Sequence, residues 1–381
     1  MIDLDQQATT PLAPDALAAM LPWLRQGHWN PHSAHAGGRQ ARAAVEAARA
    51  RIAQVLATDP ARVVFTSGAT EANNLALKGF FGAGARGRLL TFATEHSCVL
   101  EAARALARDG VDVTILAVRP DGLPDLDRYA AELARGDVAL VSAMRVNNEV
   151  GAIWPVAAMA QAAHRAGARF HTDAAQAFGK IGCRLIEDLG DADLVSVSAH
   201  KIYGPKGVGA LVVAPDLKLR PLLDGGGQER FRSGTQSPAL AAGFGAAATL
   251  AMQRLEADQA HARALQARAL ELLRASGVAF EVNGPPPDGP DRLPTNLSLR
   301  FPGVPATRLI PQLRDVLVSS GAACSSGAGR PSHVLAALGL SREAVAETIR
   351  VGFGRYTTPD EIDRGFSAIA KTVMRMQSAA R

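Results

Sequence analysis

The chain has 381 residues, 48% hydrophobic and 20% charged, and it contains no repeat or long polar tract, which is typical of a globular protein with a large core. Its formal net charge of +5 is carried mostly by arginines interspersed with acidic residues, so a nucleic-acid partner is not expected. The N-terminus lacks the features of a signal peptide, and no apolar run approaches the roughly 18 residues of a membrane span. We therefore expect a cytoplasmic protein with no membrane partner.

The three cysteines, Cys98, Cys183 and Cys324, are too few and too scattered to form a disulfide framework or a CxxC metal site. A reducing compartment suits them, and no bound metal is expected. Cys98 and Cys183 are predicted to be structural.

Short apolar, β-branched runs alternate with alanine-rich stretches between residues 60 and 215, a pattern that predicts an α/β fold with a mainly parallel sheet covered by helices. The seven predicted strands, in chain order, are 62–66, 88–93, 111–116, 138–144, 168–173, 193–198 and 208–213. Helical patterns lie between most of them, at 71–81, 98–110 and 157–168.

A long helical pattern at 236–275 is followed by the breaker cluster NGPPPDGPDRLP. Beyond this cluster we expect a smaller α+β unit, with strands near 295–301 and 316–320 and then helices to the end of the chain. The predicted division is a large domain over 15–255 and a small domain that joins 1–14 to 256–381. The small domain would carry a loop at about 319–331.

Polar residues follow five of the predicted strands. In open α/β sheets the ligand crevice lies beyond the carboxyl ends of the strands, so these side chains are predicted to share one site. They are Ser67 to Glu71, Glu95 with His96, Asn147 with Asn148, Asp173 with Gln176, and Ser198 with His200 and Lys201.

The stretch FTSGATEANN runs from a predicted strand through a glycine turn into a helix, whose N-terminal N–H groups and dipole favour a phosphate, with Thr70 as a further donor. A simple helix cap is the alternative interpretation. No Walker A or dinucleotide-binding fingerprint is present, so the phosphate would belong to another ligand.

Lys201, one of only six lysines, follows a buried type of strand, and a lysine in a crevice can form a Schiff base with an aldehyde cofactor. Asp173 would be a buried carboxylate that needs a cationic partner, and the protonated ring nitrogen of pyridoxal phosphate supplies one. A structural Asp–Lys pair remains the alternative. His96 is predicted to stack on a flat ring or to move a proton, although a helix cap would also explain it.

The stretch SSGAACSSGAGRPSH, at 319–333, sets Cys324 among Ser, Gly and Ala residues. Small residues give the backbone wide conformational freedom and leave little side chain to bury, so a surface loop is predicted. Cys324 is either a chance cysteine on a linker or a thiol that has to move.

Taken together, these residues resemble the cysteine desulfurases, in particular the NifS- and IscS-like branch of the class V aminotransferase group, which are pyridoxal-phosphate enzymes of fold type I. Ten stretches match in the family's order: LDQQATTPLAP, NPHSAHAGGR, VFTSGATEANNLALKG, TEHSCVLE, VNNEVGAIWP, HTDAAQAFGK, SAHKIYGPKGVGAL, GGGQERFRSGT, SSGAACSS and IRVGFGRYTT.

The resemblance implies a role for each matching residue. Lys201 would hold the cofactor aldehyde, Asp173 would pair with the ring nitrogen, Gln176 would contact the ring hydroxyl and His96 would stack on the ring. The implied phosphate donors are the Ala69 backbone, Thr70, Ser198, His200 and, across a homodimer interface, Thr235. Asn148 would contact cofactor and substrate, and Arg350 would grip the substrate carboxylate.

The implied reaction takes sulfur from L-cysteine, leaves alanine and places a persulfide on Cys324. Lys201 and His96 would manage the proton transfers. A sulfur-acceptor protein, such as an iron–sulfur scaffold or a thiolation relay, would then receive the sulfur. A selenocysteine lyase or another class V aminotransferase remains a second hypothesis. A sulfur or iron carrier without catalysis is a third, and Lys201, Asp173 and His96 argue against it.

Overall fold

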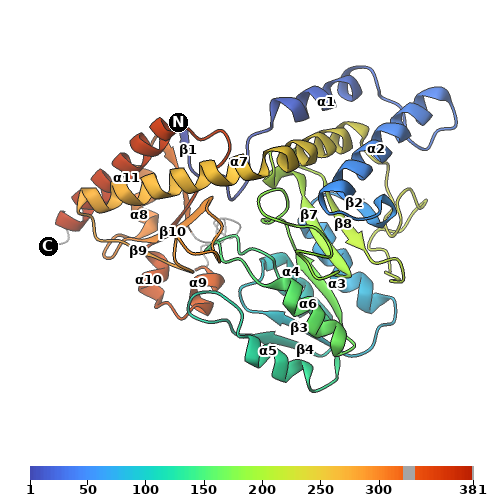
Figure 1. The fold of residues 1–381 in the computed structure, drawn as a ribbon, viewed down its shortest axis with the longest axis horizontal. Helices are drawn as coiled ribbons and strands as arrows, with labels where there is room; N and C mark the ends of the chain where they lie inside the picture. Colours follow the sequence, from blue (N-terminus) through green and yellow to red (C-terminus); the bar gives the residue numbers. More distant parts are fainter. Residues whose placement is uncertain (321–330, 380–381) are drawn as a thin grey trace.

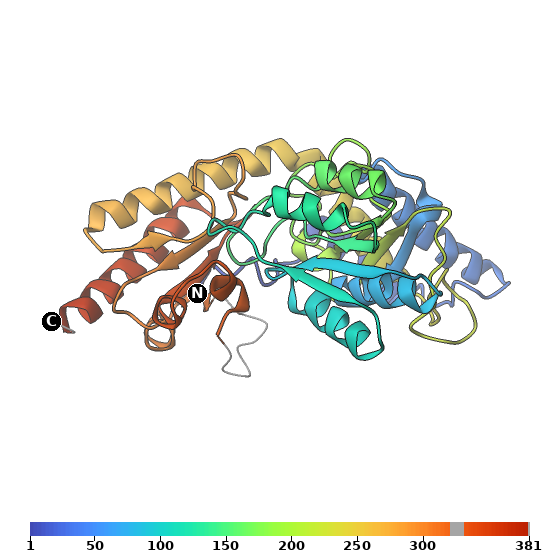
Figure 2. The same cartoon turned by 90° about the horizontal axis from the view of Figure 1, so that it is seen from below.

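The computed structural model describes residues 1–320 and 331–379, so Cys324 lies outside the described residues. Two main sheets organise the chain: the larger one has a hydrophobic core on each face, and the smaller one has a core of its own. Figure 1 shows the larger sheet with helices around it and the smaller sheet beside it, and Figure 2 shows the same arrangement from below. The predicted α/β architecture is confirmed.

The larger sheet has seven strands in the order β2-β8-β7-β6-β5-β3-β4. Strand β8 is antiparallel to both of its neighbours, β2 and β7, and the remaining pairs are parallel. The strands are β2 (Val63–Thr66), β3 (Arg88–Phe92), β4 (Val113–Leu116), β5 (Val138–Ser142), β6 (Arg169–Asp173), β7 (Leu194–Ser198) and β8 (Gly209–Val213). All seven predicted strands are present.

Alternate residues of these strands enter two different cores, because successive side chains of a strand point to opposite faces. Leu194 packs with one cluster and Val195 with the other, and Leu211 and Val212 divide in the same way. On the first face lie α3 (Ala69–Gly82) and α4 (Ser97–Arg108).

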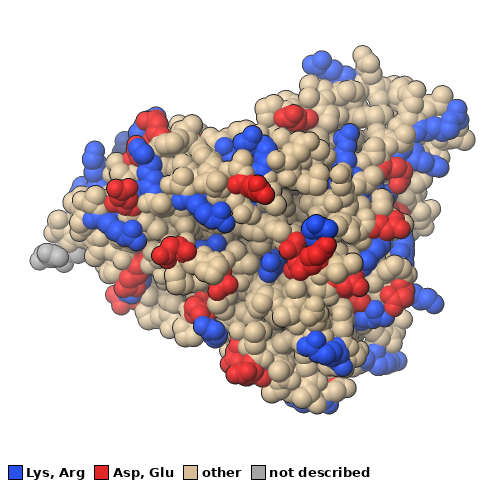
Figure 3. Space-filling view, viewed as in Figure 1, with Lys and Arg blue, Asp and Glu red and all other residues tan. Residues whose placement is uncertain are grey.

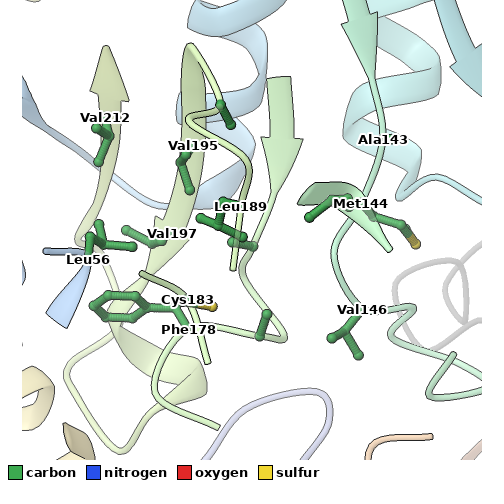
Figure 4. Packing of buried hydrophobic residues seen from close by; sticks show 14 of the residues in the cluster. Leu56, Ala143, Met144, Val146, Phe178, Cys183, Leu189, Val195, Val197 and Val212 are labelled. Carbon is green, nitrogen blue, oxygen red and sulfur yellow. The ribbon is translucent and has the colours of Figure 1, made fainter. Parts of the chain in front are cut away.

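The second face is covered by α1 (Pro14–Arg25), α2 (Ala36–Val55), α5 (Leu126–Leu133), α6 (Val156–Arg165) and the first part of α7 (Pro238–Ser276). Figure 4 shows part of the cluster beneath these helices, including Phe178, Cys183 and Val197. Cys183 is only 3% exposed, which agrees with a structural role.

The smaller sheet has the order β12-β13-β10-β9, with every pair antiparallel, and β1 pairs with β11 beside it. The four strands of this sheet are β9 (Glu281–Val282), β10 (Asn296–Arg300), β12 (Ser319–Ser320) and β13 (Thr348–Gly352), and the separate pair is β1 (Ile2–Asp3) with β11 (Val316–Leu317). The helices of this part are α8 (Ala306–Leu309), α9 (His333–Ala337), α10 (Arg342–Ala346) and α11 (Pro359–Ala379).

The expectation of helices alone after Cys324 is wrong, because β13 lies between α10 and α11. Each of its five residues is buried, and β10 and β12 pair with it on its two sides. A central strand of this kind is stabilised by partners that are distant in sequence, which a local pattern does not reveal.

Helix α7 packs against α1 and α2 at one end and against α11 at the other (Figure 1). One helix therefore packs against a core of the larger sheet and against the core of the smaller sheet. It ends at Gly277, whose left-handed backbone (φ 74°) suits a residue without a Cβ. The predicted domain boundary at 255 falls inside this helix and stays a prediction.

No helix in the described part of the chain is long and apolar enough to cross a membrane. On the face shown in Figure 3, Lys and Arg side chains are interspersed with Asp and Glu side chains.

Candidate active site

A cavity of about 460 Å³ opens where the strands β2, β3, β5, β6 and β7 end. Twelve of the residues predicted to form a site line it: Ser67, Gly68, Ala69, Thr70, Glu71, His96, Asn148, Asp173, Gln176, His200, Lys201 and Arg350. They come from the loops that follow five strands of the larger sheet and from β13 of the smaller one. The cavity therefore lies between the two sheets, and both contribute to its wall.

The N-terminus of α3 forms one end of the cavity, and no side chain in the described part of the chain caps this helix. Its first N–H groups are therefore available to an anion. A Cβ added to Gly209 would lie 2.6 Å from the Val197 carbonyl oxygen and 2.7 Å from the Gly68 Cα, so only glycine fits beneath the turn.

Lys201 ends the short 3₁₀ turn Ala199–Lys201 that follows β7. Its Nζ donates to the carbonyl oxygens of Gln7 (2.7 Å) and Ala8 (2.8 Å), which belong to the N-terminal segment. This segment reaches the cavity from the smaller sheet, because Gln6 N donates to Gly352 O and Thr10 N to His200 O.

Asp173, at the end of β6, is 7% exposed, and its carboxylate accepts two hydrogen bonds from the described residues. Asn73 Nδ2 donates to its Oδ2 at 2.7 Å, and Ala175 N donates to its Oδ1 at 2.9 Å. Because Asn73 Nδ2 also lies 3.1 Å from Cys98 Sγ, the Asp173 carboxylate and the Cys98 thiol share one amide.

His96 both caps α4 and lines the cavity, so the two interpretations offered for it are compatible. Its Nδ1 accepts from the Cys98 backbone N–H at 3.2 Å and lies 3.0 Å from Cys98 Sγ. Cys98 lines the same cavity, although only a structural role was predicted for it from the sequence.

Two buried glutamates stand behind the cavity wall. Burial, and then the nearby Asp173, raises the pKa of Glu95 well above its usual range, although Met144 N donates to Glu95 Oε1 at 2.6 Å. Burial raises the pKa of Glu149 to about 7, while the hydrogen bond from Ser332 Oγ at 2.5 Å and the charge of Arg350 oppose the shift.

Arg350 is 2% exposed and lies on β13. Its guanidinium donates to the Asn148 carbonyl oxygen at 3.2 Å and to Asp5 Oδ1 at 3.1 Å. A buried guanidinium at a cavity wall suits an anionic ligand such as a carboxylate.

Gln176 and His200 complete the wall. Gln176 Nε2 donates to Gln7 O at 3.0 Å, and Lys180 Nζ donates to Gln176 Oε1 at 2.7 Å. His200 Nδ1 lies 3.1 Å from Thr9 Oγ1, and burial, together with Lys201, Lys180 and Lys206, lowers the pKa of His200 to about 4. His200 is therefore neutral near pH 7.

Five predicted site residues do not line this cavity within the described chain, and two of them, Glu95 and Asn147, are buried beside it. Ser198 is fully buried at the end of β7, and its Oγ has no hydrogen-bond partner among the described residues. Thr235 is exposed and lines a neighbouring cavity of about 130 Å³, which shares Ser67 and Gly207 with the larger one. Cys324 lies outside the described residues.

Sequence reasoning missed Gln7, Asp5, Cys98 and Lys180 as contacts of the site. The stretch LDQQATT contains both N-terminal residues, but nothing local indicates that it crosses between two sheets. Cys98 lies two residues after His96 at the start of a helix. This spacing was the one feature of the sequence that could have placed Cys98 near the site.

The aminotransferase class-V family model matches residues 2–364. The curated mitochondrial cysteine desulfurase of Saccharomyces cerevisiae is 44% identical over 98% of this chain and 75% of its own length. A solved structure named as a NifS-like protein is similar with a TM-score of 0.90 and 32% identity, over 98% of this chain and 99% of that one.

A second solved structure, SspA in complex with cysteine, has a TM-score of 0.80 and 34% identity over 94% of this chain and all of that one. The family match spans most of the chain, and the fold and the ordered motifs agree with it. The chain therefore belongs to the aminotransferase class-V family and, within it, to the cysteine desulfurases.

Proposed function

We propose that the chain is a pyridoxal-phosphate enzyme that removes sulfur from L-cysteine, releases L-alanine and carries the sulfur as a persulfide on Cys324. The observation that carries this proposal is the single cavity in which Lys201, Asp173, His96 and Arg350 meet. The similarity to SspA in complex with cysteine supports cysteine as the substrate.

The residues present fit pyridoxal phosphate. The uncapped start of α3 and the glycine pair Gly68 and Gly209 leave room for a phosphate beside free N–H groups. The buried Ser198 Oγ, which lacks a hydrogen-bond partner among the described residues, is a candidate donor to it. The neutral His200 is a further candidate, together with the Ala69 backbone and Thr70.

Lys201 would hold the cofactor through its aldehyde, and Asp173 would pair with the ring nitrogen. Burial, and then the nearby Asp173, raises the pKa of Glu95 well above its usual range, which disfavours a second carboxylate charge beside Asp173. His96 would stack on the ring, and Gln176 and Asn148 would contact its edge. Bound pyridoxal phosphate supplies an electron sink for charge that develops at the substrate Cα.

The substrate carboxylate would bind Arg350 in place of the Asp5 contact. Lys201 would take the Cα proton, and His96 would assist in proton transfer. The Cys324 thiolate attacks the substrate sulfur, so that an S–S bond forms while the Cβ–S bond breaks. The electron pair of the broken bond ends on Cβ, which takes up a proton, and the proton held by Lys201 returns to Cα, which gives alanine.

Four further expectations belong to this proposal. The enzyme acts as a homodimer in which Thr235 reaches the partner's phosphate site. A sulfur-acceptor protein, an iron–sulfur scaffold or a thiolation relay, receives the persulfide sulfur. Free thiols at Cys98 and Cys183 suit a reducing compartment such as the cytoplasm. The domain division remains 15–255 against 1–14 with 256–381, supported by the separate cores of the two sheets.

The test is release of alanine and sulfide from L-cysteine in the presence of a thiol reductant. Wild type should turn over, whereas Cys324→Ala and Lys201→Ala should not. Cys324→Ala should still show the spectral change of the cofactor on mixing with cysteine. If Cys324→Ala releases alanine as fast as wild type, the cysteine is not the sulfur acceptor, and a selenocysteine lyase or an aminotransferase becomes the better hypothesis.

A further inference from the structure

Lys180 contacts the site from behind Gln176. It lies four residues after Gln176, and its Nζ donates to Gln176 Oε1 at 2.7 Å. Its backbone carbonyl accepts from Gln259 Nε2 at 2.9 Å, which ties the same segment to α7. The sequence motif HTDAAQAFGK contains Lys180, but the proposed chemistry gives this lysine no task.

The two ends of the Gln176 amide have fixed chemical partners. In its ammonium form Lys180 can only donate, and its Nζ faces the amide oxygen. The carbonyl oxygen of Gln7 can only accept, so the amide nitrogen must face Gln7, at 3.0 Å. The hydrogen-bond network itself therefore determines the orientation of this amide.

The network continues to Lys201, because Gln7 O also accepts from Lys201 Nζ at 2.7 Å. Gln176 Nε2 carries two hydrogens, and within residues 1–320 and 331–379 Gln7 O accepts one of them. Since Gln176 lines the cavity, the second hydrogen is available to a ligand there.

We propose that Lys180 is a positioning residue: by donating to Gln176 Oε1 it prevents the amide from reversing, and so holds Gln176 as a hydrogen-bond donor to the ring oxygen of the bound cofactor. This inference rests on the proposed function, because it requires pyridoxal phosphate in the cavity. Lys180 touches neither cofactor nor substrate in this role.

The charged groups around Lys180 oppose its protonation. Burial, and then Lys201 and Arg350, lowers the pKa of Lys180 to about 7. Despite these costs, the Lys180 Nζ lies at hydrogen-bond distance from Gln176 Oε1. Gln259 donates to the backbone carbonyl of Lys180, so anchoring this segment to α7 does not require a lysine side chain.

The test is the pH midpoint of the visible absorbance band of bound pyridoxal phosphate, measured on the holoenzyme. A donor to the ring oxygen stabilises its anionic form and lowers that midpoint. Lys180→Met should therefore raise the midpoint by about one pH unit and weaken cofactor binding by about three- to tenfold. Lys180→Arg, which keeps a donor, should stay close to wild type. Lys371→Met removes an exposed lysine from α11 and is the control for loss of charge.

The same measurement in a Gln176→Ala background separates positioning from simple electrostatics. If Lys180 acts through Gln176, Lys180→Met has no further effect there. An equal shift in both backgrounds, or no shift in either, overturns the inference, and so does an arginine variant that behaves like methionine. If circular dichroism shows that Lys180→Met is unfolded, Lys180→Ala takes its place. A wild-type protein that forms no cofactor band would instead refute the proposed function.

Discussion

Replacement of Glu149 by glutamine should change the pH dependence of stability. Glu149 is 3% exposed, and burial raises its pKa from an ordinary value of 4.5 to about 7. Between these two values the folded protein binds a proton that the unfolded chain has released, so stability falls as the pH rises through this window. One pKa unit corresponds to about 1.4 kcal/mol, so the total loss is about 3 kcal/mol.

Glutamine cannot ionise, yet its amide oxygen can still accept the hydrogen bond from Ser332. The free energy of unfolding of Glu149→Gln, relative to wild type, should therefore increase by about 3 kcal/mol between about pH 4 and about pH 8. Urea unfolding at several pH values, at one protein concentration, measures this difference.

Glu343→Gln is the matched control, because Glu343 is exposed at the start of α10. Its stability difference from wild type should not change with pH by more than a few tenths of a kcal/mol, roughly the size of an ordinary surface effect. If the wild-type and Glu149→Gln profiles run parallel from low to high pH, Glu149 is not held protonated by the fold, and the reasoning from burial is wrong.

Three other variants test separate parts of the structure. Gly209→Ala should lower stability by about 1–3 kcal/mol, seen as a lower Tm, and weaken pyridoxal-phosphate binding, because its Cβ would meet Gly68 within 2.7 Å. His171→Gln should lose less stability on acidification below about pH 6.5 than wild type, because burial lowers the pKa of His171 to about 3 and protonation therefore favours the unfolded chain. In a Cys324→Ser background, iodoacetamide should label Cys98 before Cys183, and pyridoxal phosphate should slow that labelling; mass spectrometry after timed quenching measures both. Cys183 should react slowly with iodoacetamide because it is 3% exposed and burial raises its pKa to about 12.

The seven strands of the larger sheet could be predicted because each is a short apolar run between helical patterns and turn residues, which are local features. Strand β13 could not, since its sequence TIRVG follows a helical pattern and it is held by β10 and β12. Arg350 was predicted only through the resemblance, and its place on a central strand, beside Asp5, follows from that distant pairing.

The residues of the candidate site that follow strand ends were predictable as one group, because parallel strands end at the same edge of a sheet. Gln7 and Asp5 were not, because the N-terminal segment that carries them is held by contacts of Asp5 and Gln6 with Gly352, far along the chain. Lys180 was not predicted either, since its role depends on which end of the Gln176 amide faces it.

The crossing of the N-terminal segment has a consequence for the order of folding. Residues Ile2 and Asp3 pair with Val316 and Leu317, and Gln6 N donates to the Gly352 carbonyl oxygen. The first residues to be synthesised therefore pair with residues near the end of the chain. Long-range contacts of this kind form late in folding. The seven-stranded sheet can be complete while Lys201 still lacks its Gln7 and Ala8 acceptors. A nascent chain can therefore complete the contacts of its N-terminal segment with the smaller sheet only after Gly352 has been made.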